Sequence, residues 1–150
     1  MATLQLKYPE ISNFIGGQNV PFKGRMLEVN SPLNGEIISM VPLSDRAELD
    51  LAVEKAKAAW PAWAATPVKE RVQVFYRYKT LLEAHLDELS ALVQEENGKT
   101  YAEARAEVEK SIELTEFACS LPQLISGELL EVSRGVECRV EHKPLGVVAS

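Results

Sequence analysis

The sequence predicts an α/β fold in which strands come first, helices follow, and strands return near the end. Three observations support this prediction. Short apolar runs separated by glycine turns fill the first forty residues, helical spacing of apolar residues fills 44–120, and strand-like patterns return from 128 to 150. Of the 150 residues, 46% are hydrophobic and 25% are charged, which is the composition of a globular protein rather than a disordered one.

Charge and cysteine usage limit the possible partners. The net charge is −6 and no basic block occurs, so we expect no nucleic-acid partner and no anionic membrane surface. No apolar stretch reaches membrane-spanning length, and the opening "MATLQLKYPE" lacks the pattern of a secretion signal. Cys119 and Cys138 have no metal-ligand spacing. We therefore expect reduced thiols, no metal site and a cytoplasmic location.

Two hairpins are predicted before residue 44. Phe14-Ile15 precede Gly16-Gly17, whose conformational freedom favours a tight turn. The apolar runs 26–29 and 37–41 flank a second turn, in which Asn34-Gly35 is a strong turn pair.

Three helices are predicted next. The first begins with Ser44 as its cap and ends at Pro61. The second begins at Thr66-Pro67, with the proline in the first helical position, and runs as one apolar stripe to a left-handed cap at Gly98. Only Lys79 interrupts that stripe.

The third helix and a strand ribbon complete the pattern. Thr100 can cap the third helix, which runs to Pro122. A two-stranded ribbon is predicted around Arg134-Gly135, since charged and apolar residues alternate after this turn. Its apolar face comprises Val136, Cys138 and Val140.

Several side chains could carry chemistry, but each also has a simple structural interpretation. The histidines lie among charged residues, as solvated surface histidines do, and no base is suggested beside either cysteine. Packing is the expected role of both cysteines and of the tryptophan pair, which we expect to form a helix-end cluster. These residues are His85, His142, Cys119, Cys138, Trp60 and Trp63.

Two short motifs and one charged row are also ambiguous. The "IGGQ" stretch at 15–18 is predicted to be a turn, because a dinucleotide fingerprint follows a parallel strand and opens a helix. The "NGKT" stretch at 97–100 lacks the upstream glycine of a phosphate loop. Glu103, Glu107 and Lys110 are most simply a solvated helix face with charge pairs at helical spacing.

The order of these features resembles the N-terminal part of the aldehyde dehydrogenase superfamily. The resemblance covers about residues 12–150 and rests on "NFIGG", "EVNSPLNGEIISMVPLS", the helical segment 52–100 and "KPLGVVAS". Within the superfamily, "ENGKT", "EVEKSIELTEFACSLPQLISGE" and "PLGVVAS" are most similar to the CoA-acylating methylmalonate-semialdehyde dehydrogenase branch.

The resemblance implies a division of the chain. Residues 1–127 would form the N-terminal strands and outer helices of a Rossmann-type NAD-binding domain. Residues 128–143 would form a ribbon of the oligomerisation domain, which implies a homo-oligomer. Residues 144–150 would be the first strand of the dinucleotide-binding sheet, which would explain why this apolar run follows Pro144.

The resemblance also implies the reaction. A cysteine thiolate attacks a small aldehyde, hydride passes to NAD, and coenzyme A or water resolves the thioester. The nucleophilic cysteine, the oxyanion-stabilising asparagine and the phosphate-binding helix would all follow "PLGVVAS", so this sequence supplies no catalytic residue and no cofactor-binding residue can be named. Neither Cys119 nor Cys138 matches the nucleophile.

One residue departs from the branch. Lys110 stands where the branch usually has an arginine proposed to hold the carboxylate of the substrate. Lysine keeps the charge but lacks the planar fork that grips a carboxylate through two bonds. Lys110 is therefore the candidate substrate-binding residue. The alternative is a solvated lysine paired with Glu103, Glu107 or Glu113.

Three interpretations of the whole remain open. The chain is an inactive piece of an NAD-dependent aldehyde dehydrogenase, or a non-catalytic module that associates with itself or with full-length subunits. The third interpretation is that these residues do not fold stably alone. The apolar ending favours the first interpretation, since an independent module should end on polar, capped structure.

Overall fold

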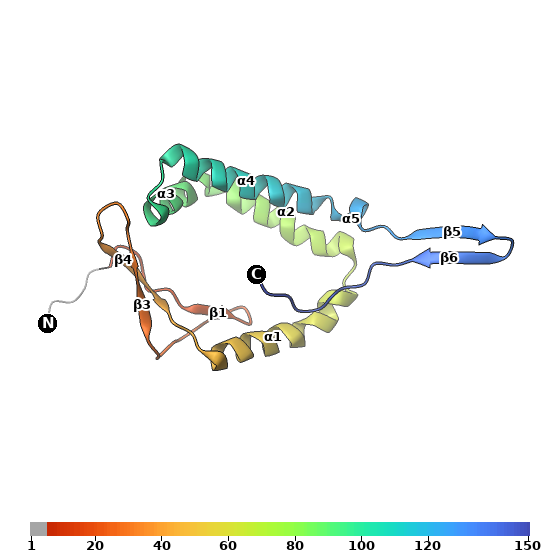
Figure 1. Ribbon diagram of the computed structural model, residues 1–150, viewed down its shortest axis with the longest axis horizontal. Helices are drawn as coiled ribbons and strands as arrows, with labels where there is room; N and C mark the ends of the chain where they lie inside the picture. The colour runs from red at the N-terminus through yellow and green to blue at the C-terminus, as the bar shows by residue number, and fades with distance from the viewer. Residues whose placement is uncertain (1–5) are drawn as a thin grey trace.

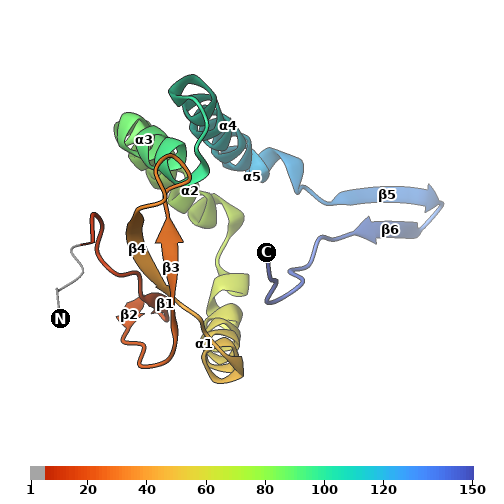
Figure 2. The same cartoon turned by 60° about the vertical axis from the view of Figure 1, so that its left-hand side comes forward.

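The computed structural model describes residues 6–150, which form an open ring (Figure 1). Hairpins and one helix form one side, a helical layer forms the other, and a ribbon projects from the ring (Figure 2). In order, the elements are β1 (Asn13–Ile15), β2 (Gln18–Val20), β3 (Met26–Asn30), β4 (Ile37–Pro42), α1 (Arg46–Ala65), α2 (Val68–Ala84), α3 (Leu86–Asn97), α4 (Tyr101–Cys119), α5 (Leu121–Leu124), β5 (Glu128–Ser133) and β6 (Val136–Val140).

Both predicted N-terminal hairpins are confirmed. β1 pairs antiparallel with β2 across Gly16-Gly17, whose φ angles of 62° and 81° lie in the left-handed region that glycine tolerates. β3 pairs antiparallel with β4, with a register shift between Val29 and Asn30. The connecting turn closes with an amide of Gly35 that donates to the carbonyl of Ser31 at 2.8 Å.

α1 differs from its predicted bounds at both ends. Its cap is Asp45, which accepts from the amide of Ala47 and forms a capping box with Glu48, whereas Ser44 hydrogen-bonds the side chain of Asn13. The predicted stop at Pro61 is wrong, because the helix continues to Ala65 with the proline inside it. Proline has no amide hydrogen to donate and is disfavoured inside a helix. The last turn of α1 is nevertheless closed, because the amide of Thr66 donates to the carbonyl of Ala62.

The predicted single helix from 66 to 98 is two helices. Pro67 is the N-cap of α2 rather than its first residue, and His85 serves both as C-cap of α2 and as N-cap of α3. With a ψ angle of 17°, His85 departs from helical geometry, and α3 packs against α4 beyond this break. Lys79 fits the apolar stripe because its ammonium bridges helices, with Glu83 at 2.6 Å and Glu116 of α4 at 3.5 Å.

The predicted caps around residue 99 are confirmed. Gly98 ends α3 in the left-handed conformation, with φ 70°. Thr100 begins α4 with a capping box, since it accepts from the amide of Glu103 while the Glu103 carboxylate accepts from the amide of Thr100. Ala104, Val108, Thr115 and Cys119 form the buried face of α4.

The ribbon of β5 and β6 is confirmed, and the strand predicted after it is not formed. The ribbon projects away from the ring, and all its residues are exposed (Figure 1). Residues 141–150 form neither strand nor helix. A strand needs a neighbour for its backbone groups, and Gly146, with φ 106°, interrupts the extended conformation.

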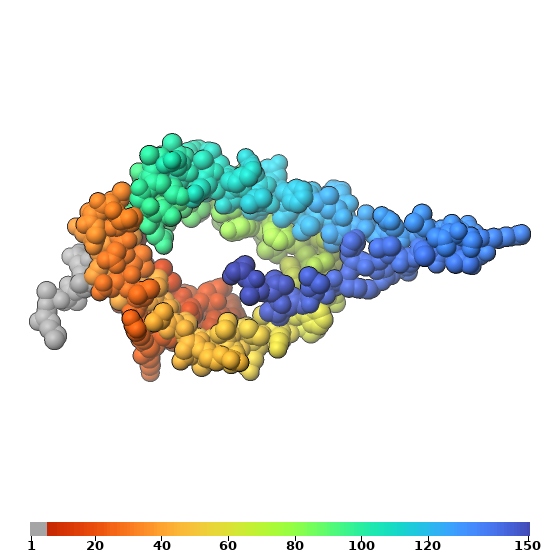
Figure 3. Space-filling view, viewed as in Figure 1, coloured from red at the N-terminus to blue at the C-terminus, as the bar shows by residue number. Residues whose placement is uncertain are grey.

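The core is sparse. The buried apolar residues are Ile38, Val72, Leu82, Ala104, Val108 and Cys119. Figure 3 shows a hollow between the helical layer and the side formed by α1, with the C-terminal segment lying in it. α1 buries no residue in the described chain, so its predicted apolar stripe, including Leu49 and Trp60, lies open.

None of the described helices combines the length and apolarity needed to cross a membrane.

Candidate functional site

Lys110, the predicted substrate-binding residue, lies on the outer side of α4. It is two residues beyond the buried Val108, which places it on the opposite helix face. Its side chain is 66% exposed, and its ammonium lies 2.5 Å from the Glu113 carboxylate. The surface pairing described as the alternative is therefore present, with Glu113 as the partner. The Lys110 ammonium stays at the surface of the helix in this contact.

The other two glutamates of the predicted row have separate partners. The Glu103 carboxylate accepts from the Thr100 hydroxyl at 2.7 Å, and this hydrogen bond lowers the pKa of Glu103. Glu107 pairs with Lys99 at 2.5 Å. Lys110 thus faces one carboxylate rather than a cluster.

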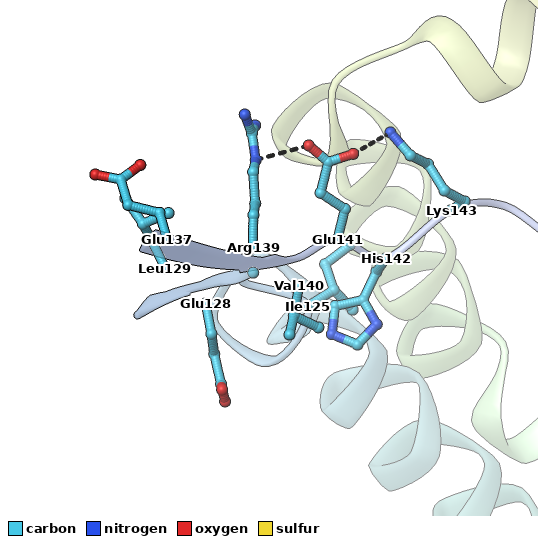
Figure 4. A pocket seen from close by; sticks show the side chains of 10 residues that line it. Ile125, Glu128, Leu129, Glu137, Arg139, Val140, Glu141, His142 and Lys143 are labelled. Carbon is cyan, nitrogen blue, oxygen red and sulfur yellow. Dashed lines mark ion pairs between the residues drawn. The ribbon is translucent and has the colours of Figure 1, made fainter. Parts of the chain in front are cut away.

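The base of the ribbon contains an open, charged cavity of about 710 Å³ (Figure 4). The Glu141 carboxylate lies between two cations there, with Arg139 Nε at 2.7 Å and Lys143 on the other oxygen. His142 also lines the cavity and lies near Val140 (Figure 4). The alternating sequence of the ribbon does not predict this cavity. The shape of the cavity depends on how the two strand ends leave the ring.

The two histidines and two cysteines are not brought together as a catalytic group. His85 Nδ1 contacts Glu88 at 2.8 Å on the surface, at the junction of α2 and α3. Cys119 is buried on α4, which confirms its prediction as a small buried apolar residue. Cys138 is opposite Leu130 on the exposed ribbon.

The tryptophan cluster predicted at the end of the first helix is not formed among the described residues. Trp60 and Trp63 are both exposed, because α1 continues past Pro61 and no described helix or strand covers this part of it. Only the C-terminal segment comes near among the described residues, since a methyl group on Gly146 would lie 4.0 Å from Trp60 Nε1. The hollow of the ring lies beside this helix (Figure 3).

An ionic cluster joins α3 to α4, and the sequence has no signal for it. Asp87 accepts from the Tyr101 hydroxyl at 3.0 Å and pairs with Arg105 at 2.5 Å, while Arg105 also binds Glu109. Arg105 and Glu109 are four positions apart on α4, which is the usual spacing of a helical ion pair. The contacts of Asp87 span 14 and 18 positions, so they depend on how the two helices pack.

No dinucleotide or metal site can be built from residues 6–150 alone. None of the described His, Cys, Asp and Glu residues form a group of three or more that could hold a metal. Gly16-Gly17 joins two antiparallel strands, and Gly98 ends a helix, so neither glycine turn leads from a strand into a helix N-terminus. The residues present do not fit a pyrophosphate.

Comparison with known proteins identifies the relationship of the chain. The model of the aldehyde dehydrogenase family matches residues 20–150. The chain belongs to the aldehyde dehydrogenase family. It is 44% identical over 141 residues to malonate-semialdehyde dehydrogenase 2 of Geobacillus thermodenitrificans, covering 93% of this chain and 29% of the relative. It is also 40% identical over 140 residues to malonate-semialdehyde dehydrogenase of Pseudomonas aeruginosa.

Solved aldehyde dehydrogenases share the architecture. The methylmalonate-semialdehyde dehydrogenase of Oceanimonas doudoroffii matches with a TM-score of 0.86 at 35% identity, covering 92% of this chain and 28% of that one. A protein of Sinorhizobium meliloti 1021 described as a methylmalonate-semialdehyde dehydrogenase, complexed with NAD, matches with a TM-score of 0.80 at 35% identity, covering 87% and 27%. The predicted α/β fold class and family resemblance are confirmed. The chain spans about 29% of the length of the curated relatives it matches.

Proposed function

We propose that the protein containing this chain oxidises malonate or methylmalonate semialdehyde, with NAD as hydride acceptor and coenzyme A as acyl acceptor. The observation that supports this most is the 44% identity over 93% of the chain to a malonate-semialdehyde dehydrogenase. The NAD in the S. meliloti structure supports the cofactor assignment. When bound, NAD accepts the hydride, and residues outside this chain hold the cofactor.

The contribution of this chain to that reaction is a positive charge for the carboxylate of the semialdehyde. Lys110 is exposed on α4, and among residues 6–150 its one ionic partner is Glu113. A semialdehyde carboxylate can replace Glu113, because the flexible lysine stem lets the ammonium swing between neighbouring anions. We assign Lys110 as a substrate-binding residue near the mouth of the substrate tunnel, in residues 1–127 of the NAD-binding domain.

Kinetics on the full enzyme test this assignment. We expect Lys110→Ala to raise KM for malonate semialdehyde about ten- to a hundredfold, the usual effect of a lost charged hydrogen bond, and to leave KM for neutral propanal unchanged. Lys110→Arg should keep the KM for malonate semialdehyde close to its original value. The matched control is Lys69→Ala, which removes another exposed lysine, on α2. Equal kinetics for Lys110→Ala and the control on both aldehydes would refute the role.

A polypeptide limited to these 150 residues has no dehydrogenase activity, in our proposal. The described residues place neither cysteine beside a base, and they form no pyrophosphate site. Assaying it with NAD, coenzyme A and several aldehydes should give no NADH above the blank. Cysteine-dependent NADH formation would overturn this part of the proposal.

Association is a second candidate function, and the exposed ribbon favours it. Leu130 and Cys138 are opposite one another, and Val136 and Val140 alternate with Cys138 onto the same face. A two-stranded ribbon cannot cover such a face by itself. We propose that residues 128–143 join copies of the protein into a homo-oligomer in the cytoplasm, and that residues 144–150 pair as a strand once neighbouring strands are present.

A further inference from the structure

Residues 7–11, here called the strap, run along the free edge of β4. The amide of Tyr8 donates to the carbonyl of Ile38 at 2.9 Å, and the amide of Ile11 donates to the carbonyl of Met40 at 2.8 Å. Both contacts advance in the same direction, so the strap is parallel to β4. It covers backbone carbonyls on the side of β4 that β3 does not occupy.

The strap also satisfies a buried hydroxyl. Ser39 of β4 is 4% exposed, and its Oγ donates to the carbonyl of Pro9 at 2.8 Å. Without the strap, this hydroxyl and the two β4 carbonyls would lose their partners. The strap therefore protects an edge that would otherwise present unpaired groups to other chains.

A single carboxylate fastens the strap to α3. Glu95 binds the Lys7 ammonium through both oxygens, at 2.7 and 2.8 Å, and Oε2 also accepts from the Tyr8 hydroxyl at 2.6 Å. The Glu95 side chain is only 18% exposed, and the Lys7 ammonium lies 5.4 Å from the centre of the Tyr8 ring. Two adjacent strap residues thus depend on one group that is 87 positions away from Tyr8.

The strap lines one side of a partly open, mainly apolar cavity of about 300 Å³ between the hairpin and α3. Ile11 of the strap, Val29 of β3 and Leu92 of α3 contribute to its walls. β3, β4 and α3 form the other walls of the cavity, so the departure of the strap widens its opening.

We propose that residues 7–11 form a releasable latch, fastened by Glu95, which covers the edge of β4 and one side of this cavity. The latch opens as a unit, because Lys7 and Tyr8 share their acceptor. It opens without unfolding the helices, since all strap residues except Tyr8 are exposed and short exposed segments open at low free energy.

Hydrogen-exchange mass spectrometry on the full protein tests the latch. We expect Glu95→Gln to accelerate exchange about tenfold in peptides that report the amides of Tyr8 and Ile11, as loss of a charged acceptor predicts. Amides of α4 should be unchanged, which separates local opening from global unfolding. The control, Glu96→Gln, removes the neighbouring carboxylate of the same helix and should leave the strap protected. Equal exchange in the two variants would overturn the proposal.

A second variant tests the sharing of Glu95 and remains informative if Glu95→Gln also loosens α4. Tyr8→Phe removes one hydroxyl and should accelerate strap exchange by itself. In the Glu95→Gln background, Tyr8→Phe should add no further acceleration, since the acceptor is already weakened. If the accelerations of exchange caused by the two substitutions multiply in the double variant, Lys7 and Tyr8 are held independently, and the latch proposal is wrong.

Discussion

Gly98→Ala tests how the β3–β4 turn packs on the end of α3. Gly98 has φ 70°, and an added methyl group would lie 2.8 Å from Pro32 Cγ and 3.3 Å from Pro32 Cβ. Left-handed strain costs about 1–2 kcal/mol for a residue with a side chain. The overlap with the rigid proline ring destabilises the fold by about 1–3 kcal/mol more. The lower entropy of the unfolded chain with alanine stabilises the fold by about 0.4–1 kcal/mol. We expect a loss of about 3 kcal/mol in the free energy of unfolding.

Gly35→Ala is the matched control, because it separates strain from contact. Gly35 lies in the same turn with φ 76°, but an added methyl group would meet nothing within 4 Å. This variant should lose only about 1 kcal/mol, so urea unfolding of the full protein should separate the two by about 2 kcal/mol. Equal losses within experimental error would refute the docking of the turn against Gly98.

Three further predictions concern the caps and the ribbon. Thr100→Ala removes the hydroxyl that caps α4 and should lower the free energy of unfolding by about 1 kcal/mol in urea titrations. The hydrogen bond from Thr100 depresses the pKa of Glu103 below 4.5, so its stabilising effect is present above that pH and is lost as the pH falls through the folded value. Glu103→Gln should therefore reduce the loss of stability as the pH falls below about 5, measured by urea midpoints. Val136→Lys should weaken self-association in light scattering, whereas Glu137→Lys, on the other ribbon face, should not; indifference to both would contradict an association surface.

The features that the sequence predicts well depend on nearby residues. Gly16-Gly17 turns a hairpin, and Gly98 and Thr100 bound their helices, because each signal acts within a few positions of the chain. The ribbon was also predictable, since alternation along 136–140 is a property of the strand itself. Local chemistry is enough for such features.

The features that it mispredicts depend on packing or on missing neighbours. Pro61 was expected to end α1, although a proline only removes one amide and the helix continues beyond it. The break at His85 separates two helices that both pack on α4, and the pattern of apolar residues runs straight through it. Residues 145–148 have a strand pattern but no neighbouring strand among the described residues, so their place in a sheet stays a prediction.

The sequence predicts on which helix face Lys110 lies, but not which groups it contacts. The spacing of Glu103, Glu107 and Lys110 indicates one charged face, but it does not decide which carboxylate Lys110 selects. The contacts of Glu95 with Lys7 and Tyr8 had no sequence signal, because 87 or more positions separate them.

The small number of buried residues has a thermodynamic consequence. Among the described residues, four of those buried are hydroxyl-bearing side chains, each of which donates to a backbone carbonyl: Ser31, Ser39, Ser90 and Thr115. Heat capacity rises on unfolding when apolar surface enters water, and falls when polar surface does. The heat-capacity change of this fold should therefore lie below the usual figure of about 12–15 cal/mol/K per residue. Its stability curve should be shallow, with weak dependence on temperature.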